Sequence, residues 1–477
     1  MAYCGYIIRL KNVRKHSNAD RLQLADCFGN TVIVGLEYTE GQLGVYFPVD
    51  GQLSAEFCAA NDLVRRKDEN GNPAGGYLDP EKRNIKAMKL RGEKSDGLFM
   101  PLTALANFTT VSDLKEGDTI TVLNGVEICK KYIPKHNRSG EWHGGSKGRK
   151  TKVDFCPTFA QHVDTEQLAY NLNAFKTGDV VELTLKMHGT SGRTGYLPLR
   201  KEKPLNWFRK LFKKHPDIYY EYGYVTGTRR VVLDNTHDGG YYDDNSFRLR
   251  MAEKFEGKLH KGETVYYEIV GFVNDQTPIM ASVKNSKISD KAFTKQYGEE
   301  TVFSYGCDPN GGWEETSCAP DELYVDRLTA TTTEVIPPRC EVYVYRMTMT
   351  NEDGDAIEYS PEQMRMRCDQ MGVKYVPVFE EFMIPEHPGE VLTDKAGDTD
   401  YGVCSPGEYV LRKVEQYFDG PDPIGKTHIR EGVVARIVNR PTIAVYKHKN
   451  FSFKVLEGIA KDVADAPDME EAQDVVE

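Results

Sequence analysis

The stretch Glu182-Leu-Thr-Leu-Lys186-Met-His188-Gly189-Thr190-Ser191 decides how the rest of the chain is interpreted. Residues 182–186 alternate between polar and apolar side chains, which predicts a β-strand with one buried face. Gly189 then indicates a tight turn. The pattern therefore puts Lys186 at the end of a strand, where the turn holds its amine in one position. A lysine in such a turn is common in proteins, so its role depends on the rest of the sequence.

Four further motifs follow this stretch in order, and each is weak alone. They are Thr226-Gly-Thr228-Arg229-Arg230, Val265-Tyr-Tyr-Glu268-Ile-Val-Gly271, Glu431-Gly432-Val-Val-Ala-Arg436 and Tyr446-Lys447-His-Lys449. Arg229 is suited to bidentate capture of a phosphate. Glu268 and Glu431 offer oxygen ligands for magnesium, or acceptors for a ribose hydroxyl.

The lysines complete a set with a common chemistry. A lysine attacks as a nucleophile only when its amine is neutral, and both burial and nearby like charges depress a lysine pKa. Lys447 and Lys449 could supply those charges to Lys186, and they could also hold the α-phosphate of a nucleotide. One attacking amine, several phosphate-binding cations and two carboxylates together indicate nucleotidyl transfer.

The order of these five motifs resembles the covalent nucleotidyltransferase superfamily, which contains the ATP-dependent ligases and the mRNA-capping guanylyltransferases. Histidine in Lys186-Met-His188-Gly189-Thr190 looks most like the nick-sealing, RNA ligase 2-like branch. Two flanking stretches are also similar to that branch, namely His162-Val-Asp164-Thr-Glu166-Gln-Leu and Phe451-Ser-Phe-Lys-Val-Leu-Glu-Gly. The resemblance is dense from about Thr165 to Gly458.

This resemblance implies an RNA ligase that joins 3′-hydroxyl and 5′-phosphate ends with ATP and Mg²⁺ (or Mn²⁺), through a lysyl-AMP intermediate and an adenylylated 5′ end. Lys186 would carry the AMP. The other roles are also implied by the resemblance: a metal on Glu431, the nucleoside or a metal on Glu268, the α-phosphate on Lys447 and Lys449, the 5′-phosphate on Arg229, a nucleotide-binding turn at Gly189, assistance in phosphoryl transfer by His188, and adenine stacking by Tyr345. Leu185 stands where some relatives carry a glutamate that reads the adenine amine.

The length of 477 residues predicts more than one domain. The first hundred or so residues contain short β-rich runs separated by turn residues, and Asn18-Ala-Asp-Arg-Leu-Gln-Leu-Ala-Asp resembles OB-like modules of tRNA-handling enzymes. We therefore predict an α+β protein: an OB-like β-barrel module over 1–128, a basic linker over 129–155, an adenylyltransferase domain of antiparallel sheets flanked by helices over 156–458, and an acidic tail over 459–477. Alternatively, the first module only braces its neighbour.

The formal net charge of −11 argues at first against a nucleic-acid partner, but local basic clusters matter more for phosphate contacts. Eight Lys or Arg residues lie between Lys130 and Lys152 against one acid, and seven lie between Arg200 and Lys214 against one acid. The second cluster has helical apolar spacing from Pro204 onward. The expected partner is RNA with 5′-phosphate and 3′-hydroxyl ends, most simply a nicked duplex or an RNA–DNA hybrid, and a cleaved tRNA also stays open.

Cysteine spacing and the length of the apolar runs indicate where in the cell the protein is expected. None of the ten cysteines forms a C-x-x-C pair, which argues against a structural zinc site or a disulfide framework. The N-terminal residues lack the features of a signal peptide, and no apolar run reaches membrane-spanning length. We expect a monomer without a membrane partner in the cytoplasm of a bacterial or phage-infected cell, or of the host cell of a virus.

Three alternatives to an RNA ligase remain open. A capping guanylyltransferase and a DNA ligase use the same lysine chemistry, but His188 and the lack of a recognisable OB domain after Lys449 count against both. A non-catalytic RNA-binding protein with a decayed site is the third. It is disfavoured because the lysine, arginine and glutamate residues of all five motifs are retained together.

Overall fold

The computed structural model describes residues 3–67, 73–90, 93–132, 156–163, 165–203, 217–233, 246–273, 277–288, 291–305, 307–308, 312–313, 340–388 and 404–457. Strands predominate, and six α-helices occur among these residues. The predicted α+β class is confirmed. The basic linker after residue 132, the basic segment 204–216 and the acidic tail lie outside the described residues.

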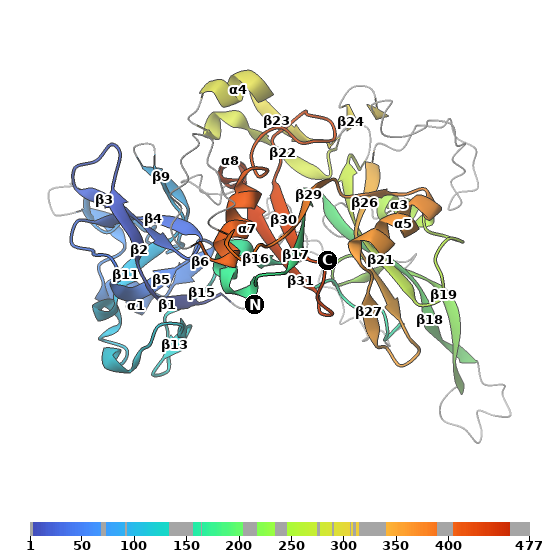
Figure 1. Cartoon of the computed structure of the whole chain (residues 1–477), viewed down its shortest axis with the longest axis horizontal. Coiled ribbons are helices and arrows are strands. Elements are labelled where there is room, and N and C mark those ends of the chain that lie inside the picture. Colours follow the sequence, from blue (N-terminus) through green and yellow to red (C-terminus); the bar gives the residue numbers. More distant parts are fainter. Residues whose placement is uncertain are drawn as a thin grey trace, which may run out of the picture.

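Two mostly antiparallel sheets form the body of residues 156–457 (Figure 1). The first has the order β16-β31-β30-β17-β29 and the second β20-β19-β18-β21-β26-β27, with β28 paired to β26. The strands of the first sheet are β16 (Glu166–Gln167), β17 (Val180–Lys186), β29 (Val378–Met383), β30 (Gly432–Ile437) and β31 (Ala444–Lys449). Those of the second are β18 (Thr190–Lys203), β19 (Asp217–Gly227), β20 (Val232–Leu233), β21 (Glu263–Gly271), β26 (Cys340–Thr350), β27 (Ala356–Glu358) and β28 (Lys374–Tyr375).

The chain passes from the first sheet to the second between Lys186 and Thr190, because β17 ends in one sheet and β18 begins in the other. Gly189 makes this crossing possible. A Cβ at that position would lie 2.3 Å from the backbone oxygen of Ile269 in β21, a separation that real Cβ atoms do not show. The predicted strand and turn around the lysine are therefore present, and they place Lys186 where the two sheets meet.

Helices cover the outer faces of both sheets. On the second sheet α3 (Ser246–Glu253) and α5 (Pro361–Met371) pack over a core that includes Phe247, Val265 and Met364. On the first sheet α7 (Pro406–Glu415) packs over Leu183 and Val433. The N-termini of α5 and α7 are fixed by capping boxes, with Ser360 and Ser405 as the capping residues.

A smaller group of elements adjoins the two sheets. It comprises β22 (Met280–Lys284), β23 (Glu300–Phe303), α4 (Lys291–Tyr297), the short pair β24 (Cys307–Asp308) and β25 (Gly312–Trp313), and α8 (Phe451–Leu456). In Figure 1, α4, β22, β23 and β24 lie at the top and α8 lies beside the N-terminal module. Phe303 and Phe453 join α8 and β23 to the core of the second sheet. The helix α8 follows β31 closely, with only Asn450 between Lys449 and its first residue.

Residues 3–132 form several small sheets rather than one closed barrel in the described part of the chain. The OB-like barrel therefore stays a prediction. A four-stranded sheet contains β1 (Gly5–Arg9), β5 (Leu43–Phe47), β11 (Leu98–Pro101) and β12 (Thr119–Ile120), and a three-stranded sheet contains β2 (Lys11–Lys15), β3 (Leu22–Cys27) and β4 (Asn30–Gly35). Two strand pairs are β6 (Gly51–Leu53) with β15 (Cys129–Lys131) and β7 (Arg65–Lys67) with β8 (Pro73–Gly75). Two more are β9 (Met88–Leu90) with β10 (Glu93–Ser95) and β13 (Val122–Leu123) with β14 (Val126–Glu127). The helix α1 (Ala55–Ala60) accompanies them.

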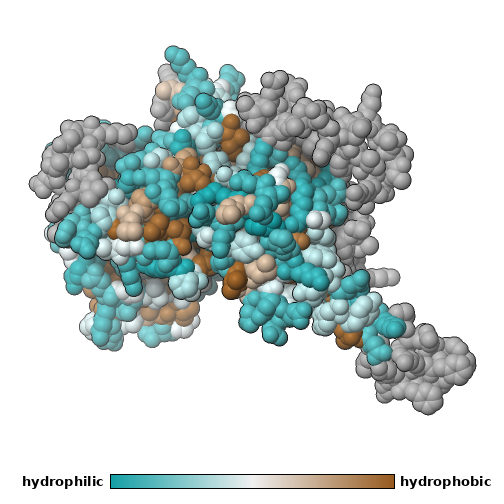
Figure 2. Space-filling model, turned by 45° about the vertical axis from the view of Figure 1, so that its right-hand side comes forward, coloured by the Kyte–Doolittle hydropathy of each residue, from teal (hydrophilic) through white to brown (hydrophobic). Residues whose placement is uncertain are grey.

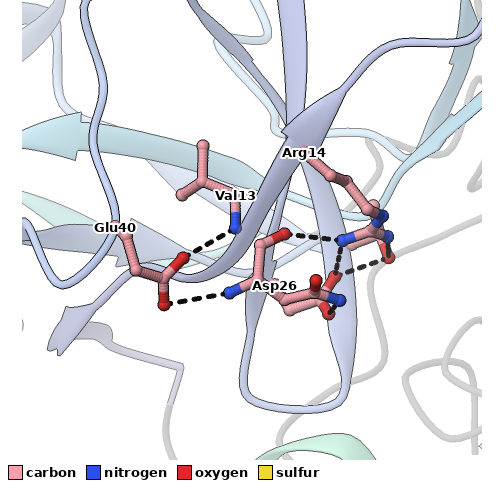
Figure 3. Close-up of polar contacts among 6 residues, drawn as sticks. Val13, Arg14, Asp26 and Glu40 are labelled. Carbon is pink, nitrogen blue, oxygen red and sulfur yellow. Dashed lines mark hydrogen bonds and ion pairs between the residues drawn. The ribbon is translucent and has the colours of Figure 1, made fainter.

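A β-bulge near the start of this module is held by side chains (Figure 3). Asn12 has a φ of 52°, in the left-handed region, and the Glu40 carboxylate accepts hydrogen bonds from the backbone N–H groups of Asn12 and Val13 at 3.1 and 2.8 Å. Arg14 donates to Asp26 at 2.9 Å across the β2–β3 pair. These contacts hold the bend of β2, which is an edge strand of its sheet, where bulges are common.

The N-terminal module packs directly against the larger domain, beside α7 and α8 in Figure 1. The Tyr170 ring, from the larger domain, lies with its centroid 6.1 Å from that of Tyr6 and 6.4 Å from that of Tyr46. Gly29 donates a backbone hydrogen bond to Ala169 at 3.1 Å. The interface is therefore closely packed.

One face of the molecule is mostly polar. Hydrophilic residues dominate the face shown in Figure 2, and apolar residues show through between them in patches. The β18–β19 hairpin extends beyond the rest of its sheet, at the lower right of Figure 1. Among the described residues, no helix has the length and apolar character needed to span a membrane.

Acid should destabilise the protein partly through His448, in β31. Burial lowers the pKa of His448 to about 4, with Lys454 and Lys94 lowering it further and Asp96 opposing them. The unfolded chain, with a histidine pKa near 6.5, therefore binds more protons between these values. The stabilising contribution is complete above about pH 6.5 and is lost as the pH falls towards 4. His448→Gln should reduce the drop in unfolding free energy between about pH 7 and 5 by about 1–2 kcal/mol, measured by urea unfolding.

The exposed His387 provides the control, since His387→Gln should leave the pH dependence of wild type unchanged. If the His448→Gln protein and wild type lose the same stability on acidification, this account of the His448 pKa is contradicted.

Candidate functional site

A cavity of 630 Å³ opens between the two sheets and reaches the N-terminal module. The first sheet contributes Lys186, Thr184 and Lys447, and the second sheet contributes Glu268 and Tyr345. Arg229 follows β19, and the module adds Tyr3, Asp50 and Lys131. Five of the predicted site residues therefore line one cavity, although they lie far apart in the sequence.

Glu268 lies in the middle of β21 and is only 8% exposed. Its Oε2 is 3.4 Å from the Ser191 hydroxyl, which donates to it. Ser191 lies directly opposite Glu268 across the β18–β21 pair. The carboxylate is therefore held on the cavity wall by the strand that begins just after the lysine turn.

Tyr345 is directed into the cavity by a β-bulge in β26. The pairing register with β21 shifts between Tyr266, which pairs with Arg346, and Tyr267, which pairs with Val344, so Tyr345 is the extra residue. Such a residue re-aims its side chain. Burial raises the pKa of Tyr345, and the charge of Glu268 raises it further, so the phenol stays protonated. The predicted stacking ring and the carboxylate share one region of the cavity.

The strand before the lysine supplies several residues of the cavity wall. Leu185 is buried in a core with Met187 and Val270, and it also borders the cavity. Thr184 and Glu182 line the cavity as well, and Glu182 is paired with Arg365. Burial raises the pKa of Glu182. Side chains two and four residues before Lys186 therefore contribute to this wall.

A buried carboxylate lies behind the opening. Glu431 has no exposed surface, and its Oε1 is 2.7 Å from Lys186 Nζ and 3.2 Å from Lys449 Nζ. The sheet register produces this arrangement, because Gly432 pairs with Lys186 on one side and with Lys449 on the other. The sequence predicted like charges next to Lys186, whereas the structure places a carboxylate directly against it.

His188 lies in the same buried group. Its Nδ1 is 3.6 Å from Glu431 Oε2, and its ring meets the edges of Phe303 and Phe453 at centroid distances of 4.7 and 4.8 Å. The imidazole is therefore packed behind the lysine rather than on the cavity wall. The predicted set divides into an open group and this buried group of His188, Glu431 and Lys449.

Two residues of the site were missed in the sequence. Glu457 accepts hydrogen bonds from Lys449 Nζ at 3.1 Å on both oxygens. Arg193 is 1% exposed and donates to the backbone oxygens of Thr228, Phe159 and Ala160. Glu457 lies in the stretch Phe451–Gly458 that carried part of the resemblance, which was the available signal. The sequence held no such signal for Arg193, because its partners are main-chain atoms.

The carboxylates suggest where a divalent cation could bind. His188, Glu431 and Glu457 have ligand atoms within 4.8 Å of one another. However, the Lys449 ammonium lies within 3.2 Å of both carboxylates and supplies the positive charge there. On the cavity side, Glu268 offers the carboxylate oxygens that magnesium prefers, whereas Glu431 lies behind the opening.

Comparison with solved structures identifies a fold of known type. Searches of protein-family models and of curated proteins find no significant match. Solved structures of Naegleria gruberi RNA ligase do match. A variant with ATP and Mn gives a TM-score of 0.51 at 16% identity over 96% of this chain and 98% of that chain. The ligase with PPi gives 0.51 at 14% identity over 94% and 97%. The chain resembles this RNA ligase in fold.

A second variant of that ligase, with AMP and Mn, gives a TM-score of 0.51 at 15% identity over 94% of this chain and 97% of that chain. The likeness extends over nearly the whole of both chains, including the N-terminal module. It lies in the fold and does not single out the nick-sealing branch. The roles of the individual site residues remain predictions.

Arg193 should be needed for the stability of the site. Lysine cannot reproduce the fork of donors, so Arg193→Lys leaves buried carbonyl oxygens without partners and should lower the unfolding free energy by about 2–4 kcal/mol. Urea unfolding measures this change. The exposed Arg230 is the control, and Arg230→Lys should alter stability by less than about 0.5 kcal/mol. Identical unfolding of the Arg193→Lys protein and wild type would contradict the role of this side chain.

Proposed function

We propose that this protein is an ATP-dependent RNA ligase that joins 3′-hydroxyl and 5′-phosphate ends through AMP carried on Lys186. One observation carries the proposal: Lys186 stands where two sheets meet, in contact with a buried carboxylate, and opens onto a cavity that Arg229, Glu268 and Lys447 also line. A nucleophile, phosphate-binding cations and carboxylates are the groups that nucleotidyl transfer needs.

In the first step Lys186 Nζ attacks the α-phosphorus of ATP, a phosphorus–nitrogen bond forms, and pyrophosphate leaves. Attack requires the neutral amine, so Lys186 has to leave its ion pair with Glu431 and lose a proton to water in the cavity when the nucleotide binds. Lys447, on the cavity wall, contacts the α-phosphate and stabilises the charge that develops on it. Lys449 supports the same charge from the buried side.

In the second step an oxygen of the RNA 5′-phosphate attacks the α-phosphorus and releases the lysine. In the third step the 3′-hydroxyl attacks the 5′-phosphorus, and AMP leaves. Arg229 binds the 5′-phosphate in these steps, since guanidinium groups hold phosphates with two hydrogen bonds. His188 assists by keeping Glu431 in place, because it contacts that carboxylate behind the cavity.

A Mg²⁺ or Mn²⁺ ion would be held by Glu268, which lies on the cavity wall, and by Glu431, which contacts Lys186 behind the opening. When bound, it neutralises charge on the triphosphate and on the leaving pyrophosphate. The solved structures of the Naegleria gruberi RNA ligase with ATP and Mn, and with AMP and Mn, support the choice of nucleotide and metal. Tyr345 stacks on the adenine.

The substrate is an RNA nick in a duplex or hybrid, bound by the basic segments and the N-terminal OB-like module. The protein acts as a monomer in the cytoplasm. A capping guanylyltransferase is the second candidate, because the cavity is bordered by the apolar Leu185 where some relatives carry a glutamate that reads the adenine amine. The choice between ATP and GTP therefore needs a direct test.

Labelling with nucleotide provides that test. Incubation with α-labelled ATP and Mg²⁺ should leave label on the protein after denaturation, whereas α-labelled GTP should not. Lys186→Ala removes the nucleophile and should reduce the label at least about a thousandfold. Removal of the metal with EDTA should abolish it, and excess Mg²⁺ should restore it.

The exposed Lys426 is the matched control, since Lys426→Ala should label like wild type. Label from GTP alone would favour the capping reaction, and persistence of the ATP label in the Lys186→Ala protein would refute the assigned nucleophile. Transfer of the label to 5′-phosphorylated nicked RNA, followed by sealing, then separates an RNA ligase from a DNA ligase.

A further inference from the structure

Glu457 is a carboxylate of the buried group that the chemistry above does not use. Both of its oxygens accept from Lys449 Nζ at 3.1 Å, and it is 2% exposed. Lys449 is also 3.2 Å from Glu431, which in turn contacts Lys186. The four side chains therefore form one continuous chain of ion pairs that ends at the nucleophile.

Glu457 gives Lys449 a second carboxylate partner. Both carboxylates lie in a buried region, and a buried charge is costly unless it is paired. Glu457 also holds the flexible Lys449 side chain in place, since both of its oxygens accept from the ammonium that Glu431 contacts as well.

The helix α8 carries Glu457 at its C-terminus and is anchored at its start. Asn450 donates its backbone N–H to the Glu431 carbonyl at 2.7 Å, and its side chain caps the helix at Phe453, 3.2 Å away. The Phe453 ring meets His188 at 4.8 Å. One short helix thus touches Glu431, His188 and Lys449.

The N-terminal module holds the other side of α8. Val49 and Ala87 of the module form one apolar cluster with Phe451 and Val455. Lys454 pairs with Asp96 of the module at 3.3 Å. Lys94 lies 4.8 Å above the Phe451 ring. Contacts from the module therefore reach α8 on the face that does not carry the active-site residues.

We propose that Glu457 is a positioning residue that holds Lys449 for AMP transfer, and that the N-terminal module supports this position by bracing α8. The inference rests on the proposed function, because it concerns the first step of that reaction. It assigns the module a part in the chemistry of the lysine, separate from any contact with RNA.

Glu457→Gln tests the first part, because it keeps the shape of the side chain and removes its charge. The rate constant of AMP transfer at saturating ATP, measured by rapid quench, should fall about tenfold to a hundredfold. The fraction of protein labelled at the end should stay at the wild-type value, because the fold is retained. A merely structural defect would lower that fraction and leave the rate constant of the folded protein unchanged.

A double-mutant cycle shows whether Glu457 acts through Lys449. ATP affinity is measured in the Lys186→Ala protein, in which no transfer occurs, with Glu457→Gln and Lys449→Gln alone and together. The double variant should lose as much ATP affinity as the Lys449→Gln variant alone, since substitutions of two partners in one pair do not have additive effects. Additive losses would overturn the assignment.

Glu263 provides the matched control, because it is a fully buried glutamate paired with Arg367 at 2.8 Å outside the cavity. Glu263→Gln should lower thermal stability and leave the rate constant of AMP transfer at the wild-type value. If wild type is labelled and the Glu457→Gln protein transfers AMP with the wild-type rate constant, this inference alone is overturned. Absence of any label in wild type overturns the proposed function, and with it the inference.

Lys454→Met tests the part of the module, because it breaks the contact with Asp96 and keeps the apolar stem. The rate constant should fall about threefold, as expected for a partly exposed ion pair. Lys413→Met is the control, since Lys413, on the neighbouring helix α7, forms a similar ion pair with Glu380 at 2.7 Å. Equal rate constants for both variants and wild type would remove the module from the proposal.

Discussion

The structure depends on one interaction, the contact of the buried Glu431 carboxylate with the ammonium groups of Lys186 and Lys449. A fully buried carboxylate is stable only with such partners. The fold supplies them through sheet register, because β30 lies between β17 and β31 and Gly432 pairs with both lysines. A shift of either strand by one residue would turn its lysine to the other face. The pairing register of these three strands therefore sets both the stability of this sheet and the geometry of the site.

Much of the site could be predicted from local patterns. The alternation before Lys186 indicated the strand, and Gly189 indicated the turn that joins the two sheets. Glu268, Lys447 and Arg229 were chosen by residue type and motif order, and all line the cavity. These predictions succeeded because strand periodicity and turn chemistry are encoded within a few neighbouring residues.

Other features depend on pairing between distant segments and had no local signal. The bulge that turns Tyr345 into the cavity arises from the register between β21 and β26. The division into an open and a buried group follows from how α8 and β23 pack around His188. Arg193 binds main-chain oxygens, which no motif records. The N-terminal strands were predicted, but their closure into a barrel depends on long-range pairing that short β-runs do not specify.

The central claim is that Lys186 carries the nucleotide while Glu431 and its neighbours hold it in place. Peptide mapping by mass spectrometry, after incubation with ATP and Mg²⁺, tests this most directly. The account predicts AMP on the peptide that contains Lys186, with fragmentation assigning it to that side chain. AMP on a different residue, or consumption of ATP with no covalent AMP on the protein, would contradict it.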